Sequence, residues 1–221
     1  MATKALLAQL SQMAQVRLGT QVDVLSVGGV DAAKRVQAGE AFDIVVLASD
    51  AIGQLAADGH VLANGVFDLV RSDVAMAIAK GRPRVQLRNE DELKAYVLAQ
   101  NRLGYSTGPS GVALAKLIER WGVRQALAER IVTAPPGVPV ASLVANGEVD
   151  LGFQQTSEML HVAGIEILGA LPEDVAITTV FTAGIGVHCQ HPQAVREVLA
   201  FWGSEDCDAA KRLQGMRSAR T

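Results

Sequence analysis

Apolar and polar positions along the chain alternate between two periods, one typical of amphipathic helices and one of buried strands. In residues 1–16 the apolar side chains fall at helical spacing with Lys and Gln between them, which predicts a helix. The pattern continues with a β-branched run at 21–25, a helix over 30–37 that stops at Gly39, a strand at 43–47, and a helix that begins at Ser49 and ends near Gly59. Repeated strand–helix units predict an α/β fold with a ligand crevice at the carboxyl ends of parallel strands.

Two long extended segments, residues 66–79 and 175–188, divide the chain. Between them the pattern predicts a strand at 103–105, a turn at 106–111, a helix that reaches Trp121, a strand at 150–153 and a helix at 155–161, and after them helices at 192–202 and 205–214. A chain that crosses to a second lobe and returns accounts for this order. We therefore expect two lobes, each a mostly parallel sheet flanked by helices, with residues 1–76 and 181–221 in the first and 77–180 in the second.

Residues 36–44 and 144–151 repeat one local pattern. VQAGEAFDI and VANGEVDL each contain a helix end, a capping Gly, a Glu, an Asp and the start of a strand. Such units also recur widely in α/β proteins. The repeat is therefore compatible with two similar lobes and with local structure that unrelated units share.

Composition and charge limit the classes of function. The chain has 221 residues and a net charge of −3 at pH 7, so it has no overall attraction to nucleic acid. No apolar run approaches the roughly 20 residues that span a membrane. Residues 1–16 do not have the pattern of a secretory leader, so we expect the protein as written to stay in the cytoplasm unless a leader has been removed or the start has been cut. Cys189 and Cys207 are more often unpaired in such a chain, and a disulfide requires export.

Small and hydroxyl residues occur at four places where a predicted strand is followed by a helix. A helix N-terminus has unpaired N–H groups and a partial positive charge, so it binds oxyanions or carboxylates without a cationic partner. The candidate ligand-binding residues are Ser26, Gly28, Gly29, Ser49, Ser106, Thr107, Ser110, Gly111, Gln154 and Thr156. The alternative interpretation is that the hydroxyl residues among them only cap their helices.

Other kinds of site find little support in the sequence. The turn STGPSG at 106–111 lacks the Gly-Lys-Ser/Thr of a phosphate loop and the spacing of a dinucleotide fingerprint. His188 and His191 flank Cys189 without a second ligand cluster in the sequence, and no G-x-S-x-G motif occurs. We expect no metal and no cofactor, and we assign no catalytic residue.

These features together make the chain resemble the molybdate-binding, type II periplasmic-binding-protein family of ABC transporters. The resemblance covers nearly the whole chain and is carried by residues 38–50, 106–111, 152–158 and 171–173, the crossing segment that ends at Gly186, and KRLQGM at 211–216. It implies the type II fold, two lobes joined by crossing strands, a closing hinge, an anion held by uncharged donors, a periplasmic location and an ABC permease as partner.

Two features depart from that family. Its members normally begin with a leader and a strand before the first helix, whereas this chain begins at or just before that helix. Either the start codon was assigned too late or the fold tolerates a missing strand, and we favour the first explanation because losing a central strand would leave buried N–H and C=O groups unpaired. The SVGGV stretch at 26–30 also has fewer hydroxyl groups than a dedicated molybdate site. Organic carboxylates therefore remain open as ligands beside molybdate.

Two functions fit these features best, and a non-catalytic intracellular sensor is a third alternative. The first is a solute-binding protein that closes two lobes on a small anion, either a molybdate-like oxyanion or a small carboxylate, for ABC-type uptake. The second is an isomerase or tautomerase of a small di- or tricarboxylate such as aconitate, an activity found among relatives of this fold. An isomerase needs a base near a C–H bond, and Glu158 and Asp50 are the acids beside the proposed donors.

Overall fold

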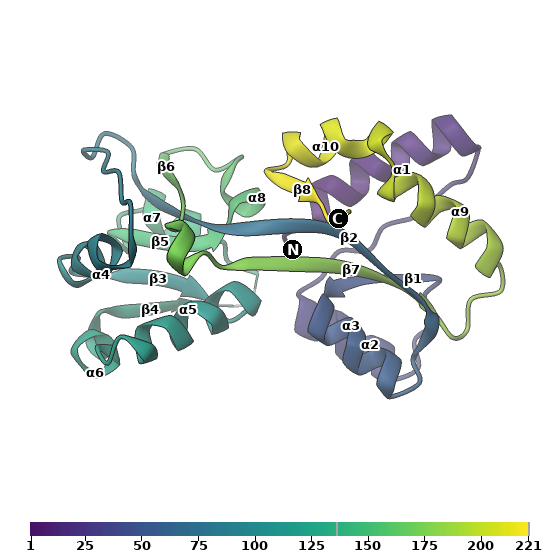
Figure 1. The fold of residues 1–221 in the computed structure, drawn as a ribbon, viewed down its shortest axis with the longest axis horizontal. Helices are drawn as coiled ribbons and strands as arrows, with labels where there is room; N and C mark the ends of the chain where they lie inside the picture. Colours follow the sequence, from purple (N-terminus) through teal and green to yellow (C-terminus); the bar gives the residue numbers. More distant parts are fainter. Residues whose placement is uncertain (136, 221) are drawn as a thin grey trace. The chain divides into compact units, whose positions relative to one another are not determined.

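The computed structural model describes residues 1–135 and 137–220, which form two compact units. Unit 1 comprises Met1–Ser72 and Val180–Thr221, and unit 2 comprises Asp73–Thr179. The chain passes between the units within two strands, β2 (Val61–Ala79) and β7 (Thr178–Gly186), so each of these strands contributes residues to both units (Figure 1). Unit 1 is therefore discontinuous in sequence.

Unit 1 is a sheet between two layers of helices. Its strands are β1 (Ile44–Ala48), the first part of β2, the last part of β7 and β8 (Met216–Ser218), in the order β1-β7-β2-β8. Its helices are α1 (Lys4–Leu18), α2 (Gly29–Gln37), α3 (Ser49–Ala57), α9 (Pro192–Gly203) and α10 (Asp208–Leu213). Helices α1, α9 and α10 cover one face of the sheet, and α2 and α3 cover the other (Figure 1). Each layer buries its own apolar cluster against the strands.

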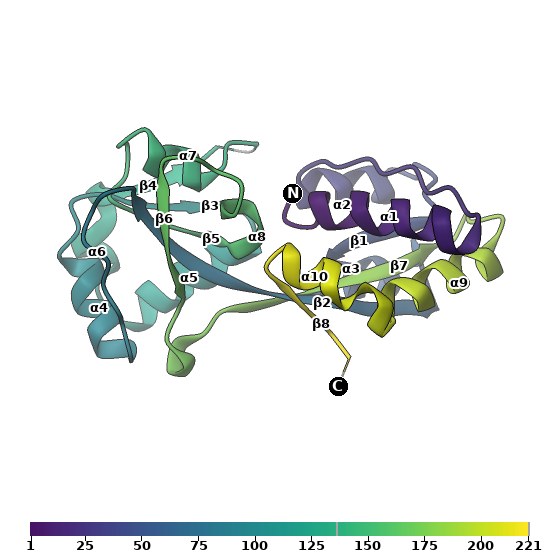
Figure 2. The same ribbon diagram turned by 90° about the horizontal axis from the view of Figure 1, so that it is seen from above.

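Unit 2 has the same three-layer construction. Its sheet has the order β6-β2-β5-β3-β4, made of β3 (Leu103–Ser106), β4 (Ile131–Ala134), β5 (Leu151–Gln155), β6 (Ile165–Ala170) and the last part of β2. Its helices are α4 (Glu90–Leu98), α5 (Pro109–Arg120), α6 (Arg124–Leu127), α7 (Val140–Ala145) and α8 (Thr156–Met159). Figure 2 shows α4 and α5 on one side of this sheet and α7 on the other.

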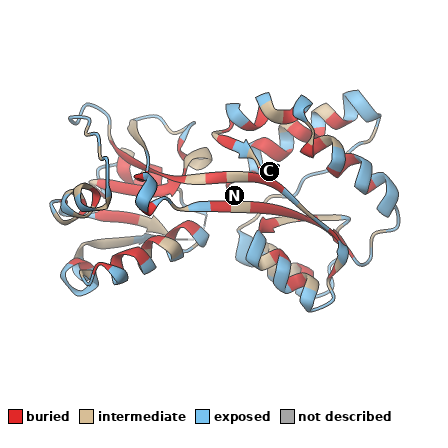
Figure 3. Ribbon diagram, in the orientation of Figure 1, coloured by how far each residue is buried: buried red, intermediate tan, exposed pale blue. Residues whose placement is uncertain are grey.

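The core of unit 2 depends on a close approach of α7 to the sheet. A Cβ added to Gly152 would lie 2.6 Å from Val144 Cγ2, and one added to Gly104 would lie 3.0 Å from Val140 Cγ1. These two glycines, on neighbouring strands, therefore make the space that α7 fills. Buried positions follow the strands of both units (Figure 3).

The predicted α/β class and the two-lobed architecture are confirmed, but the sheets contain less parallel pairing than predicted. Strand β3 runs parallel to β4 and β5. Strand β2 runs antiparallel to β5, β6 and β8, and β1 runs antiparallel to β7. Each of these antiparallel pairs contains β2 or β7, whereas the parallel pairs come from local strand–helix–strand repeats.

Two predictions about local structure are wrong. Residues 21–25 form neither helix nor strand in the described chain, and Val24 and Leu25 are 39% and 59% exposed. A β-branched run becomes a strand only where a neighbouring strand takes up its backbone hydrogen bonds. The helix predicted at 155–161 extends only over α8, Thr156–Met159, because Gln155 belongs to β5.

The repeated pattern at 36–44 and 144–151 has the same backbone conformation in both units. Gly39 follows α2 with a φ of 87°, and Gly147 follows α7 with a φ of 74°. Both values lie in the left-handed region that favours glycine. Each glycine therefore ends a helix and turns the chain toward the next strand, β1 or β5.

Neither a disulfide nor a membrane-spanning helix is found in the described residues. Cys189 and Cys207, both in unit 1, are free thiols among these residues. No helix of residues 1–135 and 137–220 is long and apolar enough to cross a membrane.

A buried ion pair holds the end of the chain against unit 1. The Lys211 side chain is fully buried, and its Nζ lies 3.4 Å from Asp208 Oδ1 and 3.4 Å from Ser218 Oγ on β8. Burial lowers the pKa of Lys211, and the Asp208 carboxylate partly offsets this effect. Arg220 also pairs with Asp208, so one carboxylate serves two cations.

We predict that the two partners of this pair respond differently to neutral substitution. Asp208→Asn leaves a buried ammonium without its carboxylate and should lower the free energy of unfolding by at least about 1 kcal/mol. Lys211→Met removes the buried charge and should be neutral or stabilising. Because the folded chain releases the Lys211 proton more readily than the unfolded chain, the parent should gain stability relative to Lys211→Met as the pH rises toward 10.5. Urea unfolding at several pH values measures both effects, and equal losses in the two variants would contradict them.

Candidate functional site

In unit 1 the predicted donors lie at the carboxyl end of β1. Helix α3 begins directly after β1, and its first residue is the exposed Ser49. Helix α2 begins at the same edge, since a Cβ added to Gly29 would lie 3.7 Å from Leu47 Cδ2 near the end of β1. Ser26 and Gly28 are half-buried in the loop that leads into α2. Two helix N-termini, each with unpaired N–H groups, therefore open at one edge of the sheet.

Carboxylates occupy part of this edge. Asp50 Oδ1 accepts a hydrogen bond of 2.9 Å from the Ala51 N–H in the first turn of α3. Asp31 lies in the first turn of α2, and a Cβ added to Gly28 would lie 3.4 Å from its Oδ2. Acids in these positions stabilise the helices but compete with an external anion for the same N–H groups. An anion bound at this edge would therefore need hydrogen-bond donors from other parts of the chain as well.

In unit 2 the predicted donors lie at the carboxyl ends of two adjacent parallel strands. Tyr105 of β3 is paired with Phe153 of β5, so the next residues, Ser106 and Gln154, follow side by side. On its other side Ser106 is paired with Ala134 of β4. Helix α5 begins three residues after Ser106, with Pro109 in its first turn. The register brings together residues that are 48 positions apart in the sequence.

The turn from Ser106 to Gly111 is unusually tight. Ser106 Oγ accepts a hydrogen bond of 3.3 Å from Gly108 N and lies 3.5 Å from Ser110 Oγ. A Cβ added to Gly111 would lie 1.6 Å from the Ser106 carbonyl oxygen. Only glycine therefore permits α5 to begin this close to β3. Thr107 is exposed at the tip of the turn, and Ser110 is buried beneath it.

The segment after β5 is less open than the sequence suggested. The buried Gln154 uses its side-chain oxygen to accept a hydrogen bond of 3.2 Å from Ala141 N on α7. The Thr156 hydroxyl donates to the Asp73 carbonyl oxygen at 2.9 Å. Burial raises the pKa of the Glu158 carboxyl, and a hydrogen bond with Gln154 opposes this change. Glu158 is thus a partly buried acid that keeps its proton to a higher pH than an exposed glutamate.

One residue at this edge was missed by the sequence analysis. Gln155 is buried, and its Nε2 donates a hydrogen bond of 2.7 Å to Thr179 Oγ1. Its Oε1 is buried without a hydrogen-bond partner among the described residues. The sequence contains no signal for this role, because its partner Thr179 is 24 residues further along the chain.

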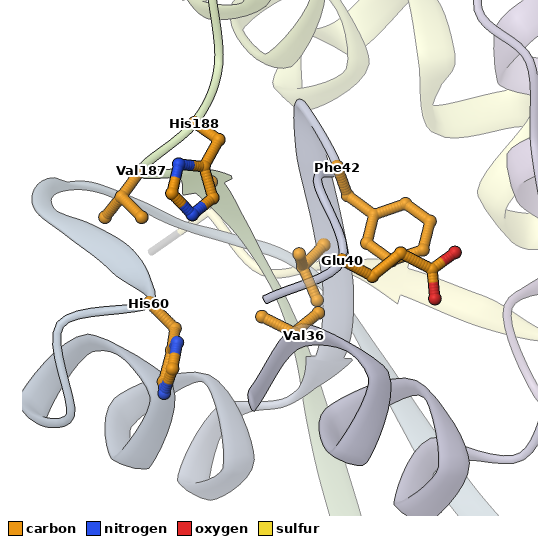
Figure 4. A pocket seen from close by; sticks show the side chains of 8 residues that line it. Val36, Glu40, Phe42, His60, Val187 and His188 are labelled. Carbon is orange, nitrogen blue, oxygen red and sulfur yellow. The ribbon is translucent and has the colours of Figure 1, made fainter. Parts of the chain in front are cut away.

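A small cavity in unit 1 lies away from these donors. It is lined at the amino end of β1 and the end of β7 by residues that include Phe42, His60, Gly186 and His188 (Figure 4). Its volume of about 10 Å³ admits about one water molecule. In the described part of the chain, no three His, Cys, Asp or Glu side chains are grouped so that they could hold a metal ion. The cavity is too small to hold a solute.

Comparison with known proteins agrees with this fold. Residues 1–217 match the family model for bacterial extracellular solute-binding proteins. The chain is 32% identical over 184 residues to an aconitate isomerase from a Pseudomonas species, a match that covers 83% of this chain and 70% of that protein. Its fold is similar to that of the periplasmic molybdate-binding protein of Azotobacter vinelandii, with a TM-score of 0.80, 19% identity and coverage of 99% and 96% of the two chains.

A second solved structure shows the same similarity. The substrate-binding domain of a putative molybdenum ABC transporter from Clostridium difficile has a TM-score of 0.77 and 14% identity, with coverage of 99% of this chain and 96% of that chain. At such low identity these structures establish the fold and not the ligand. The resemblance to type II periplasmic binding proteins that the sequence indicated is confirmed.

We predict that Gly111→Ala disrupts the turn, whereas Gly108→Ala is tolerated. The new Cβ at position 111 collides with a backbone carbonyl, so the free energy of unfolding should fall by about 3 kcal/mol. At position 108 the nearest atom is Ser106 Oγ at 3.5 Å and φ is −76°, so the loss should be below about 1 kcal/mol. Urea unfolding of both variants is the measurement. Similar losses at the two positions would show that the close approach of Gly111 is unimportant.

Proposed function

We propose that this chain, which belongs to the bacterial extracellular solute-binding proteins, binds a small organic carboxylate and delivers it to an ABC-type permease. The observation that carries this proposal is the edge of unit 2 where Ser106, Thr107 and Ser110 surround the start of α5. Backbone N–H groups at such a helix start bind an anion without a cationic side chain. A second set of donors in unit 1 would complete the site on closure.

The proposed donors divide evenly between the two units. Unit 1 would contribute Ser26, Gly28, Gly29 and Ser49, and unit 2 would contribute Ser106, Thr107, Ser110 and Gly111. Gln154 lies at the same edge, with its oxygen directed to α7. A hydrogen bond from a neutral donor is stronger when its acceptor is ionised, so these donors favour an anionic ligand.

A carboxylate is favoured over molybdate by the sequence relationship. The aconitate isomerase is 32% identical to this chain, whereas the molybdate-binding protein is 19% identical and shares only the fold. The few hydroxyl groups of the SVGGV stretch at 26–30 agree with this preference. We therefore propose small di- and tricarboxylates as the ligand class.

A second function, isomerisation of such a carboxylate, is favoured by Glu158. An isomerase needs a group that takes a proton from carbon and returns it, and a carboxyl with a raised pKa suits this task. Glu158 stands two residues after Thr156 at the proposed edge, and burial raises its pKa. The same scaffold would then bind and convert its solute.

We predict that tricarboxylates stabilise the chain and that the donor hydroxyls contribute to their binding. Thermal unfolding should be followed with citrate, cis- and trans-aconitate, tricarballylate, molybdate, tungstate, sulfate and phosphate. A ligand present at a hundred times its dissociation constant should add about 2.7 kcal/mol. Ser49→Ala and Ser106→Ala should weaken binding about tenfold each, because each removes a hydrogen bond to a charged group. Ser142→Ala, on α7, is the matched control.

The panel separates the possible ligand classes. Stabilisation by molybdate or tungstate and by no carboxylate would overturn the proposed ligand class but keep the solute-binding function. If none of the anions stabilises the chain, the proposal of an anion-binding protein is wrong.

We predict for the second function that conversion of cis- to trans-aconitate depends on Glu158. Glu158→Gln should lower the rate at least about a hundredfold, whereas Glu173→Gln, at an exposed position, should not change it. Since the base must be ionised, the rate should rise with pH through the raised pKa of Glu158. Product formation measured by chromatography is the assay. Binding without conversion in the parent chain would leave transport as the function.

A further inference from the structure

The two places where the chain enters and leaves unit 2 are joined by hydrogen bonds. Unit 2 begins at Asp73 on β2 and ends at Thr179 on β7. Thr178 Oγ1 donates to Asp73 Oδ1 at 2.6 Å, and Val74 N donates to the Ile177 carbonyl oxygen at 2.9 Å. The two crossing strands are therefore held together at the boundary of the unit.

The junction between β5 and α8 is attached to the same two places. Thr156 Oγ1 donates to the Asp73 carbonyl oxygen at 2.9 Å, and Gln155 Nε2 donates to Thr179 Oγ1 at 2.7 Å. Backbone pairing of Val74 with Gln155 adds a third connection. This junction follows the strand end at which Gln154 lies beside Ser106 of the proposed solute site. The attachment therefore runs from the solute-binding edge to both crossing strands.

The burial of these groups makes the attachment stiff. Gln155 and Thr179 are 3% and 9% exposed, so water does not readily replace the bond between them. The Gln155 oxygen is buried without a partner among the described residues, although a buried acceptor without a partner is costly. The Gln155 side chain is therefore held at this position by the hydrogen bond from its amide nitrogen to Thr179, although its amide oxygen has no partner there among the described residues.

We propose that Gln155 and Thr156 are positioning residues that couple solute binding in unit 2 to bending of β2 and β7 at residues 73 and 179. Thr156 was predicted to donate to the ligand, but its hydroxyl is directed to the backbone of β2. A solute that moves the ends of β3 and β5 displaces this junction, and both crossing strands move with it. The coupling to a solute rests on the proposed function, whereas the mechanical link does not.

Hydrogen exchange without ligand tests the link directly. Thr156→Val and Thr179→Val keep the side-chain shape and remove one hydroxyl each. Thr179→Val should raise amide exchange about tenfold at residues 155–159, and Thr156→Val should do so at 74 and 177–179. Thr182→Val is the matched control, because Thr182 lies on the same strand and donates to Asp68 Oδ1 at 2.6 Å in unit 1. It should leave residues 155–159 unchanged.

Conservative replacement distinguishes the loss of the hydroxyl's hydrogen bond from a change in side-chain packing. Thr156→Ser and Thr179→Ser retain the hydroxyl and should restore the slow exchange of the parent. Faster exchange confined to the neighbours of the mutated residue would overturn the proposal, and so would equal effects of Thr182→Val. This result does not depend on whether a ligand has been found.

Solution scattering with a saturating carboxylate tests the coupling. Ser106→Ala should weaken binding but show the full ligand-induced change in radius of gyration once saturated. Thr156→Val and Thr179→Val should show a smaller change at saturation. A full change in radius of gyration in both Val variants would overturn the coupling. If the parent chain binds none of the carboxylates, the proposed ligand class is wrong, and the hydrogen-exchange experiment alone tests the link between the junction and the crossing strands.

Discussion

The crossing of the chain through β2 and β7 is the constraint on which the rest of the structure depends. Strand β2 pairs with β8 in unit 1 and with β5 and β6 in unit 2, so both sheets use it. Strand β7 pairs with β1 in unit 1, and its first residues, Thr178 and Thr179, belong to unit 2. Strands β1, β5, β6 and β8 all run antiparallel to the crossing strand with which they pair. The local strand–helix–strand repeats of unit 2 add the parallel strands β3, β4 and β5 to its sheet.

This arrangement places uncharged donors at strand ends and keeps buried charge elsewhere. The fully buried Lys211 lies at the end of the chain with Asp208, where it holds β8 against the rest of unit 1. At the proposed solute site Glu158 is partly buried, and burial makes it a weaker acid by raising its pKa. A site built from N–H and hydroxyl donors binds an anion without the cost of burying a protein cation. Under the proposed isomerisation Glu158 would be the base.

Tight backbone contacts and side-chain hydrogen bonds have different roles at this edge. Gly111 permits α5 to start against Ser106, and Gly104 and Gly152 permit α7 to pack on the opposite face. These contacts determine where the donors stand. Gln155 and Thr156, through Thr179 and Asp73, connect the same edge to the crossing strands. The close packing and the hydrogen bonds to the crossing strands thus involve different residues.

The sequence by itself determined the elements whose signals are local. Helical spacing and a capping glycine were sufficient for α2, and an apolar run for β1, because these patterns depend on neighbouring residues. The tertiary structure decided whatever depends on partners distant in sequence. Residues 21–25 have strand composition but lack a paired strand in the described chain, and Thr156 has the character of a ligand donor but bonds to Asp73, 83 residues away. Backbone pairing and buried hydrogen bonds are completed only by the folded chain, so a single segment cannot reveal them.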